Sequence, residues 1–282
     1  MYERMLVPLD GSELGAVALP FAELIPSRHV RLLAVEPVLL TPARRRTAAA
    51  PVPPSGSWHG LTAAAYLDSI AARYRRQGRD VELVVESGAP GERIVAAAVD
   101  ADLIVMGTRG RGAGGRALFG SVADHVARHA SAPTLLVRGT DPEVVPAVAR
   151  IVVPLDGSTT AEAALAAAAT LSDTLGVRPH LVRVVDASTR SANAERLERE
   201  AAAYLEGQTA QFRARDIMAT SQVLHGPVAP TLLATIGSGD LVVMTPRGQS
   251  RVRRALLGSV AERLVREASA SVLIVRPDQQ PQ

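Results

Sequence analysis

Residues 7–12 read VPLDGS, and residues 153–158 repeat the same six letters. In both places an apolar run leads straight into Asp-Gly-Ser, a pattern typical of a buried strand that ends in a tight turn. The glycine permits the turn, and the serine is suited to cap a helix that starts directly after it. We therefore expect the same strand–turn–helix unit at two places in one chain.

The repeat extends to the other end of each half. Residues 116–138, RALFGSVADHVARHASAPTLLVR, align with residues 254–276, RALLGSVAERLVREASASVLIVR. The first half holds extra residues, which fall most naturally in the Pro- and Ala-rich stretch 37–60, a predicted long loop. A chain of 282 residues with this duplication predicts two similar domains, 1–140 and 147–278, joined by a short Pro-containing linker.

Each half alternates short apolar runs with helical patterns. The runs are β-branched and continuous, which is typical of strands buried on both faces of a sheet. This alternation predicts parallel sheets with helices on both faces, so the expected fold is α/β, with two tandem doubly wound domains. The predicted strands are 5–9, 30–35, 81–85, 103–106 and 134–137 in the first half and 151–155, 181–185, 217–223, 241–244 and 272–275 in the second.

Two loops of the first half carry residues suited to binding. In doubly wound sheets, ligands bind beyond the carboxyl ends of the strands, where the strand order reverses. After the first strand, Asp10 suits either a ligand contact or an ordinary turn. After the fourth strand, Gly107 and Gly110 open an Arg-containing loop, and Gly120 and Ser121 stand at the start of a helix. Because a helix N-terminus offers unpaired N–H donors, this loop predicts a phosphate site, with a loop that binds nothing as the alternative.

Composition narrows the chemistry. The chain contains no cysteine, and all 31 of its basic residues are arginine. Thiolate metal ligands, a Schiff-base lysine and a Walker-type phosphate lysine are therefore excluded. The net charge is +3 and the basic residues are spread along the chain, so nucleic acid is not an expected partner. No long apolar run and no signal peptide are visible in the sequence, so we expect a cytoplasmic protein without membrane insertion.

These features resemble the universal stress protein family, whose nucleotide-binding signature is G-x2-G-x9-G-[ST]. The first half matches that signature in full through Gly107, Gly110, Gly120 and Ser121. The opening VPLDGS strand and the run RLLAVEP at 31–37 also resemble the family. The resemblance extends over nearly the whole chain, as two tandem domains. The resemblance implies a five-stranded parallel sheet of order 3-2-1-4-5 in each half. It also implies pairing of the halves through their fifth strands as an internal pseudo-dimer, and it leaves a homodimer of the whole chain open.

The resemblance further implies an adenine nucleotide as ligand: ATP, with or without Mg²⁺. Asp10 and Val35 would hold the adenosine, and the glycines with Ser121 would cradle the phosphates. The chain would then act as a nucleotide-dependent stress sensor or regulator through a protein partner that the sequence does not identify. The expected contacts are Pro8, Asp10, Val35, Met106, Gly107, Arg109, Gly110, Gly120, Ser121 and Val122 in the first half and Asp156, Val185, Gly248, Gly258 and Ser259 in the second.

The second half departs from the signature at its first position. Thr245 replaces the first glycine and Pro246 removes one N–H donor, whereas Gly248, Gly258 and Ser259 are retained. A β-branched residue does not readily adopt positive φ, and its side chain crowds a phosphate that passes close to the backbone. We therefore predict a second site that is weaker or altered.

Three other functions are weighed against nucleotide sensing. A slow Mg²⁺-dependent ATPase would need a positioned water near Asp10, and a protein-interaction module would leave both glycine loops empty. His125 and His129 have an i, i+4 spacing that can bind metal, but a solvated helix face is favoured, so no metal site is predicted. No group of residues in the sequence forms a nucleophile, base and orienting partner, so the chain is not expected to be an enzyme beyond weak ATP hydrolysis.

Overall fold

The computed structural model describes residues 2–36, 61–108, 120–139, 141–186, 191–246 and 257–277. Strands and helices alternate along both halves, as the sequence predicts. The strands are β1 (Arg4–Leu9), β2 (His29–Glu36), β3 (Asp80–Ser87), β4 (Leu103–Gly107), β5 (Thr134–Val137), β6 (Arg150–Pro154), β7 (Pro179–Val185), β8 (Thr220–His225), β9 (Asp240–Met244) and β10 (Ser271–Ile274). The helices are α1 (Glu13–Ala16), α2 (Ala18–Leu24), α3 (Ala63–Arg76), α4 (Pro90–Ala97), α5 (Ser121–His129), α6 (Thr159–Leu175), α7 (Ser191–Arg213), α8 (Val228–Thr235) and α9 (Ser259–Glu267). The predicted loop 37–60 lies outside the described residues.

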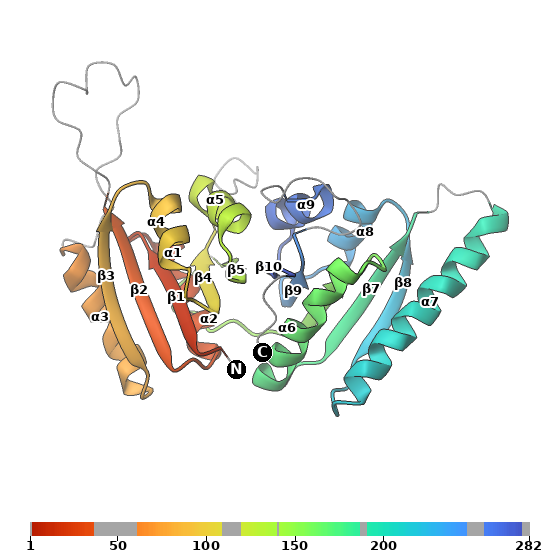
Figure 1. Cartoon of the computed structure of the whole chain (residues 1–282), viewed down its shortest axis with the longest axis horizontal. Helices are drawn as coiled ribbons and strands as arrows, with labels where there is room; N and C mark the ends of the chain where they lie inside the picture. The colour runs from red at the N-terminus through yellow and green to blue at the C-terminus, as the bar shows by residue number, and fades with distance from the viewer. Residues whose placement is uncertain are drawn as a thin grey trace, which may run out of the picture.

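All ten strands form one sheet, in the order β3-β2-β1-β4-β5-β10-β9-β6-β7-β8. Within each half the neighbouring strands are parallel, and each half has the order 3-2-1-4-5 when its strands are numbered from its own start. The strand order therefore reverses between β1 and β4 in the first half and between β6 and β9 in the second. The predicted α/β fold with two doubly wound halves is confirmed (Figure 1).

The two halves are joined through their fifth strands. β5 and β10 are antiparallel, and Leu135 lies opposite Leu273 at the centre of the pairing. The repeat makes these two leucines equivalent to each other, so a local pseudo-two-fold axis passes between them. This is the internal pairing that the sequence resemblance implies. In Figure 1 the two strands lie side by side between the two halves.

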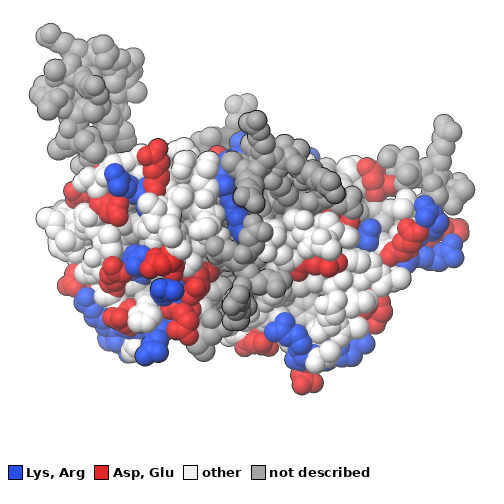
Figure 2. Space-filling model, in the orientation of Figure 1, with Lys and Arg blue, Asp and Glu red and all other residues white. Residues whose placement is uncertain are grey.

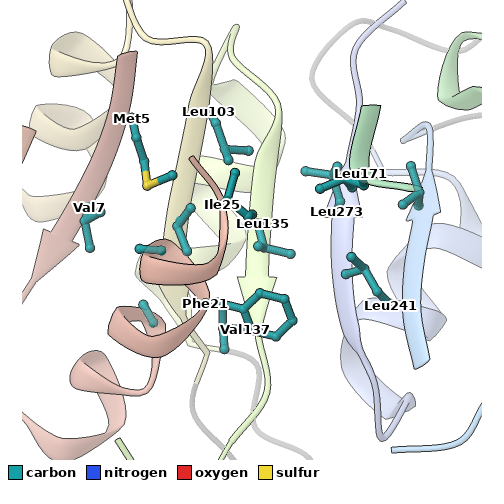
Figure 3. Close-up of a cluster of buried hydrophobic side chains, with 14 of the residues drawn as sticks. Met5, Val7, Phe21, Ile25, Leu103, Leu135, Val137, Leu171, Leu241 and Leu273 are labelled. Atoms are coloured by element: carbon teal, nitrogen blue, oxygen red, sulfur yellow. The ribbon is translucent and has the colours of Figure 1, made fainter. Parts of the chain in front are cut away.

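Two apolar cores, one on each face of the sheet, both extend across this junction. One is built with α2, α3, α6 and α7, and it includes Leu135, Leu273 and Leu171 (Figure 3). The other is built with α4, α5, α8 and α9. In α5 the buried residues are Ala123, Val126 and Ala127, whose spacing places them on one face of the helix. Because both cores contain residues from both halves, burial of apolar surface holds the halves together as well as each sheet.

Two sequence predictions about the strands are wrong. β3 and β8 are not buried on both faces, because they form the two edges of the sheet and their residues are only half-buried or exposed. The predicted strand 217–223 also begins too early. Ile217 instead belongs to the turn that follows the end of α7. Asp216 has a φ of 58°, and the Ile217 N–H donates to the Phe212 carbonyl at 3.0 Å. This is a helix C-cap in which the apolar residue after the turn packs into the core.

The first helical segment differs between the halves. In the first half it is interrupted at Val17, between α1 and α2, whereas α6 runs through 17 residues without a break. Pro20 explains the interruption, because its nitrogen has no hydrogen to donate and its ring clashes with the carbonyl four residues earlier. The equivalent residue of the second half is Ala166, which allows α6 to continue.

Candidate functional site

The turn after the first strand has the same geometry in both halves. Asp10 Oδ1 accepts hydrogen bonds from the Ser12 N–H at 3.0 Å and the Ser12 hydroxyl at 2.6 Å, and Asp156 Oδ1 is bonded to Ser158 at the same two distances. Ser12 caps α1 by accepting from the Gly15 N–H at 3.0 Å. Asp10 therefore stabilises the turn at the carboxyl end of β1, and it uses one carboxylate oxygen, Oδ1, to do so.

The glycine of each turn adopts a backbone conformation that other residues rarely adopt. Gly11 has a φ of 73°, and Gly157 has a φ of 87°. This is the left-handed region, which only glycine enters without strain. Together with the hydrogen bonds of the aspartate and the serine, these values explain why the sequence repeats Asp-Gly-Ser as a unit.

The last helix of each half begins without a side-chain cap. Gly120 is the N-cap of α5 and Gly258 is the N-cap of α9, and neither helix start receives a hydrogen bond from a capping side chain. The first-turn N–H groups, among them those of Ser121 and Ser259, therefore point out of the helix start, and within the described residues no N-cap side chain binds them. Both serines are exposed. Such a helix start is suited to an anion, because its N–H groups and the helix dipole both favour negative charge.

These features meet at one edge of each half-sheet. β1 lies beside β4, and β6 lies beside β9, so the turn after the first strand and the end of the fourth strand are neighbours. In the second half the Gly258 N–H donates to the Pro246 carbonyl at 2.7 Å, which ties the start of α9 to the end of β9. Pro246 thus removes a donor, as predicted, but its carbonyl positions the helix start.

A cavity of about 510 Å³ lies at this edge of the second half. Four of the predicted residues line it together: Asp156, Val185, Gly258 and Ser259. The fifth, Gly248, lies outside the described residues. The other lining residues are mostly apolar: Pro154, Leu155, Ala161, Val182, Arg183, Val184, Asp186, Leu197, Val228, Leu232, Met244, Thr245, Pro246, Val260 and Ala261. An apolar cleft of this size with a few convergent polar groups is typical of small-ligand sites.

The predicted residues of the first half occupy the equivalent places. Pro8 is buried in β1, Met106 is buried in β4, and Val35 and Val122 are half-buried. Asp10 and Ser121 are exposed, at the end of β1 and the start of α5. Arg109 and Gly110 lie outside the described residues.

Gly107 is required for a different reason from the one the sequence suggests. It ends β4 but is not among the described glycines with positive φ, so the φ argument against Thr245 is wrong. A Cβ at position 107 would instead overlap the backbone carbonyl oxygen of Leu14 in α1. Thr245 is buried and lines the second cavity without closing it.

The strand register shows which residue of the second half is equivalent to Val35. Pro8 pairs with Leu33, and its equivalent, Pro154, pairs with Val182. Counting two residues onward makes Val184 the equivalent of Val35, whereas Val185 is one position further along β7. Side chains alternate along a strand, so a shift of one residue places the side chain on the opposite face. Both valines line the cavity.

Sequence reasoning missed a tyrosine beside each Asp-Gly-Ser turn. Burial raises the pKa of Tyr66, and the nearby charge of Asp10 raises it further. Burial is also the first cause of the raised pKa of Tyr204, to which Glu162 and then Asp156 contribute. The signal was present in the sequence, because AAAYL occurs at 63–67 and again at 201–205.

Charges and candidate metal ligands are scattered over the described parts of the chain. Figure 2 shows Arg and acidic side chains interspersed on the visible face, without a continuous basic patch. In the described ranges no group of three or more His, Asp or Glu side chains is arranged to hold a metal ion. His125 and His129 stack with ring centroids 4.3 Å apart, and the His129 Nδ1 lies 2.8 Å from the His125 carbonyl oxygen. Of the helices that the structure describes, none is long and apolar enough to cross a bilayer.

Comparisons with known proteins agree with this architecture. The family model described as the universal stress protein family matches residues 1–138 and again residues 148–276. A universal stress protein of Mycolicibacterium smegmatis is 28% identical over 206 residues, covering 71% of this chain and 70% of that protein. One from Mycobacterium tuberculosis is 29% identical over 212 residues, covering 71% of each chain. The crystal structure of a universal stress protein from Archaeoglobus fulgidus superposes with a TM-score of 0.68 at 19% identity, covering 97% of this chain and 98% of that one.

Proposed function

The chain belongs to the universal stress protein family, and from this premise we propose that it binds ATP at the carboxyl edge of each half-sheet. We further propose that each unit, 1–140 and 147–278, holds one nucleotide and that the chain acts as a nucleotide-dependent sensor or regulator of a stress response. The observation that supports this most is the cavity of about 510 Å³ at which the uncapped start of α9 meets the Asp156 turn.

The lining of the cavity suits the parts of a nucleotide. Val184, Leu197, Val228 and Leu232 form an apolar wall for the flat face of a purine. The start of α9 supplies backbone N–H groups and the positive end of a helix dipole for phosphate oxygens. Asp156 lines the same cavity and provides an acceptor for hydroxyl groups of the sugar.

The expected strength is in the range of a regulatory site. A hydrogen bond to a charged group contributes about 1.5–3 kcal/mol, and a helix dipole adds up to about 2 kcal/mol. A few such contacts together reach the roughly 8 kcal/mol that corresponds to micromolar affinity. Any Mg²⁺ would enter with the nucleotide, because its preferred ligands are phosphate oxygens and water.

The first half has an equivalent turn and an equivalent helix start. The Asp10 turn and the uncapped start of α5 lie at the reversal point between β1 and β4. The glycine signature of this half is complete in the sequence, including Gly110 in the loop before α5. We therefore propose a nucleotide site here as well, built on backbone N–H groups.

Substitution of the first helical residue tests both sites. Ser121→Asp and Ser259→Asp place a carboxylate where phosphate should bind, while an acidic residue at a helix start favours the helix itself. Ser131→Asp and Ser269→Asp are matched controls, because both serines are exposed and lie just beyond the C-terminal ends of α5 and α9. Calorimetric titration with MgATP should show two binding events in the wild type and in both controls.

In each test variant, the affinity of the binding event in the substituted half should fall by at least about tenfold, because one charge-assisted contact becomes a repulsion. Absence of nucleotide binding in the wild type would contradict the proposal. Equal affinities in the controls and the test variants would contradict the placement of the phosphates.

A further inference from the structure

A polar network replaces apolar residues beside the second cavity. The first half has Ala16, Ala34 and Ile70 at three positions whose equivalents surround Tyr204 in the second half. The equivalent positions around Tyr204 are Glu162, Arg183 and Gln208, as the repeated sequence and the strand register show. The tyrosine is kept, and all three of its neighbours change from apolar to polar or charged.

Tyr204 stands at the centre of this network. Its hydroxyl donates to Glu162 Oε1 at 3.0 Å, and Gln208 Nε2 donates to the same oxygen at 3.3 Å. The Arg183 guanidinium carbon lies 5.0 Å from the centre of the tyrosine ring. Three elements, α6, β7 and α7, thus fix the orientation of the ring and of the cation above it.

The guanidinium also lies against the Asp-Gly-Ser turn. A Cβ on Gly157 would be 3.0 Å from Arg183 Nη1 and 3.1 Å from its Cζ and Nη2. Arg183 therefore lies close both to the Tyr204 ring and to the turn that follows Asp156. Arg183 and Asp156 both line the cavity.

The position of Arg183 determines which kind of ligand group can bind beside it. Stacking on a ring uses the face of the guanidinium, whereas its five N–H donors lie in the plane of the group. Asp156, which lines the same cavity, is a hydrogen-bond acceptor. A phosphate at this point would be repelled by the Asp156 carboxylate. A neutral group that both donates and accepts hydrogen bonds satisfies both partners, and the vicinal hydroxyls of a ribose have this property.

We infer that Arg183 and Asp156 together bind a ribose hydroxyl, so that the second site selects ribonucleotides over deoxyribonucleotides. This rests on the proposed nucleotide binding and adds its sugar specificity. In the first half Ala34 stands in place of Arg183, so only the aspartate remains for the sugar. The two halves therefore differ in selectivity, and the second site depends on a side chain that the glycine signature does not include.

The test compares ATP with 2′-deoxy-ATP and 3′-deoxy-ATP by calorimetric titration of the full chain. The event that Ser259→Asp removes is assigned to the second half. In the wild type this event should weaken about tenfold or more for at least one deoxynucleotide, the loss expected for a hydrogen bond to a charged group. The event of the first half should show a smaller ratio.

Arg183→Ala should weaken ATP binding in the second half and lower its preference for ATP over the deoxynucleotide to the smaller ratio of the first half, where alanine occupies the equivalent position. Arg183→Met keeps the apolar stem packed on Tyr204 and serves if the alanine variant does not fold, as judged by circular dichroism. Tyr204→Phe is the control for a purely structural role, because it breaks the bond to Glu162 and keeps the ring. It should retain the preference.

The outcomes separate this inference from the proposed function. An unchanged ratio between ATP and both deoxynucleotides in Arg183→Ala and Arg183→Met would overturn the role of Arg183. Equal binding of all three nucleotides by the wild-type second half would overturn it as well. A second half that binds no nucleotide at all would instead count against the proposed function, and the inference would fall with it.

Discussion

Arg138 and Arg276 occupy equivalent positions after β5 and β10, and each donates to the end of the last helix in the opposite half. Arg138 Nη2 donates to the Val265 carbonyl and, at 2.9 Å, to the Arg266 carbonyl. Arg276 Nη2 donates to the Ala127 carbonyl at 2.8 Å. The repeat makes Val265 and Ala127 equivalent, so the two contacts are reciprocal. Each arginine places a cation at the negative end of a helix dipole across the junction.

Loss of either contact should destabilise the chain. We expect Arg138→Ala and Arg276→Ala each to lower the free energy of unfolding by about 1–3 kcal/mol, since each removes a charge-assisted hydrogen bond to a helix end. Arg263→Ala is the matched control, because Arg263 forms an exposed i, i+4 pair with Glu267, a kind of pair that contributes about 0.3–0.5 kcal/mol. Denaturant titration followed by circular dichroism measures all three. Losses no larger than that of the control would show that the reciprocal contacts do not hold the halves together.

Gly107 should tolerate no side chain, whatever its role in binding. Gly107→Ala places a Cβ against the Leu14 carbonyl, and overpacking of this kind costs about 1–3 kcal/mol. Gly207→Ala is the control, because its Cβ meets nothing within 4 Å and α7 should gain about 0.5–1 kcal/mol from it. Thermal denaturation should therefore move in opposite directions for the two variants. A Gly107→Ala chain as stable as the wild type would contradict the close approach of α1 to β4.

His180 should make stability depend on pH near neutrality. Burial lowers the pKa of His180 below its usual 6.5, and the positive charge of Arg150 lowers it further. Because the unfolded state then takes up a proton more readily, stability is highest above pH 6.5 and falls as the pH drops toward the folded pKa. His180→Gln keeps a polar group beside Thr220, whose hydroxyl oxygen lies 2.8 Å from His180 Nδ1. This variant should lose less stability than the wild type between about pH 7.5 and 5.5, and equal slopes would contradict the assignment.

Much of the fold follows from local patterns. VPLDGS specifies a strand end, a left-handed glycine and a helix cap within six residues, so its repetition predicts two copies of one unit. The buried strands are short apolar runs, and their number and order along the chain are confirmed. The exceptions have local causes too: β3 and β8 lie at sheet edges, and Ile217 belongs to a helix cap that an apolar strand pattern imitates.

The candidate site was harder to predict, because it depends on which residues the fold brings together. The need for glycine at 107 arises from the Leu14 carbonyl, 93 positions earlier in the chain. The equivalence of Val35 and Val184 becomes visible only in the strand register. Arg183 belongs to no sequence motif, and its proposed role becomes visible only from its position close to Tyr204 and Gly157. The one sequence feature that indicates this part of the site is the repeated AAAYL, which contains Tyr66 and Tyr204.

The central claim is that the uncapped starts of α5 and α9 bind the phosphates of an adenine nucleotide. A crystal structure of the full chain grown with MgATP tests it most directly. We predict phosphate oxygens within hydrogen-bond distance of the backbone N–H groups of Ser121 and Ser259, with the sugar beside Asp10 and Asp156. Electron density for the phosphates elsewhere, or vacant helix starts at saturating MgATP, would contradict the account.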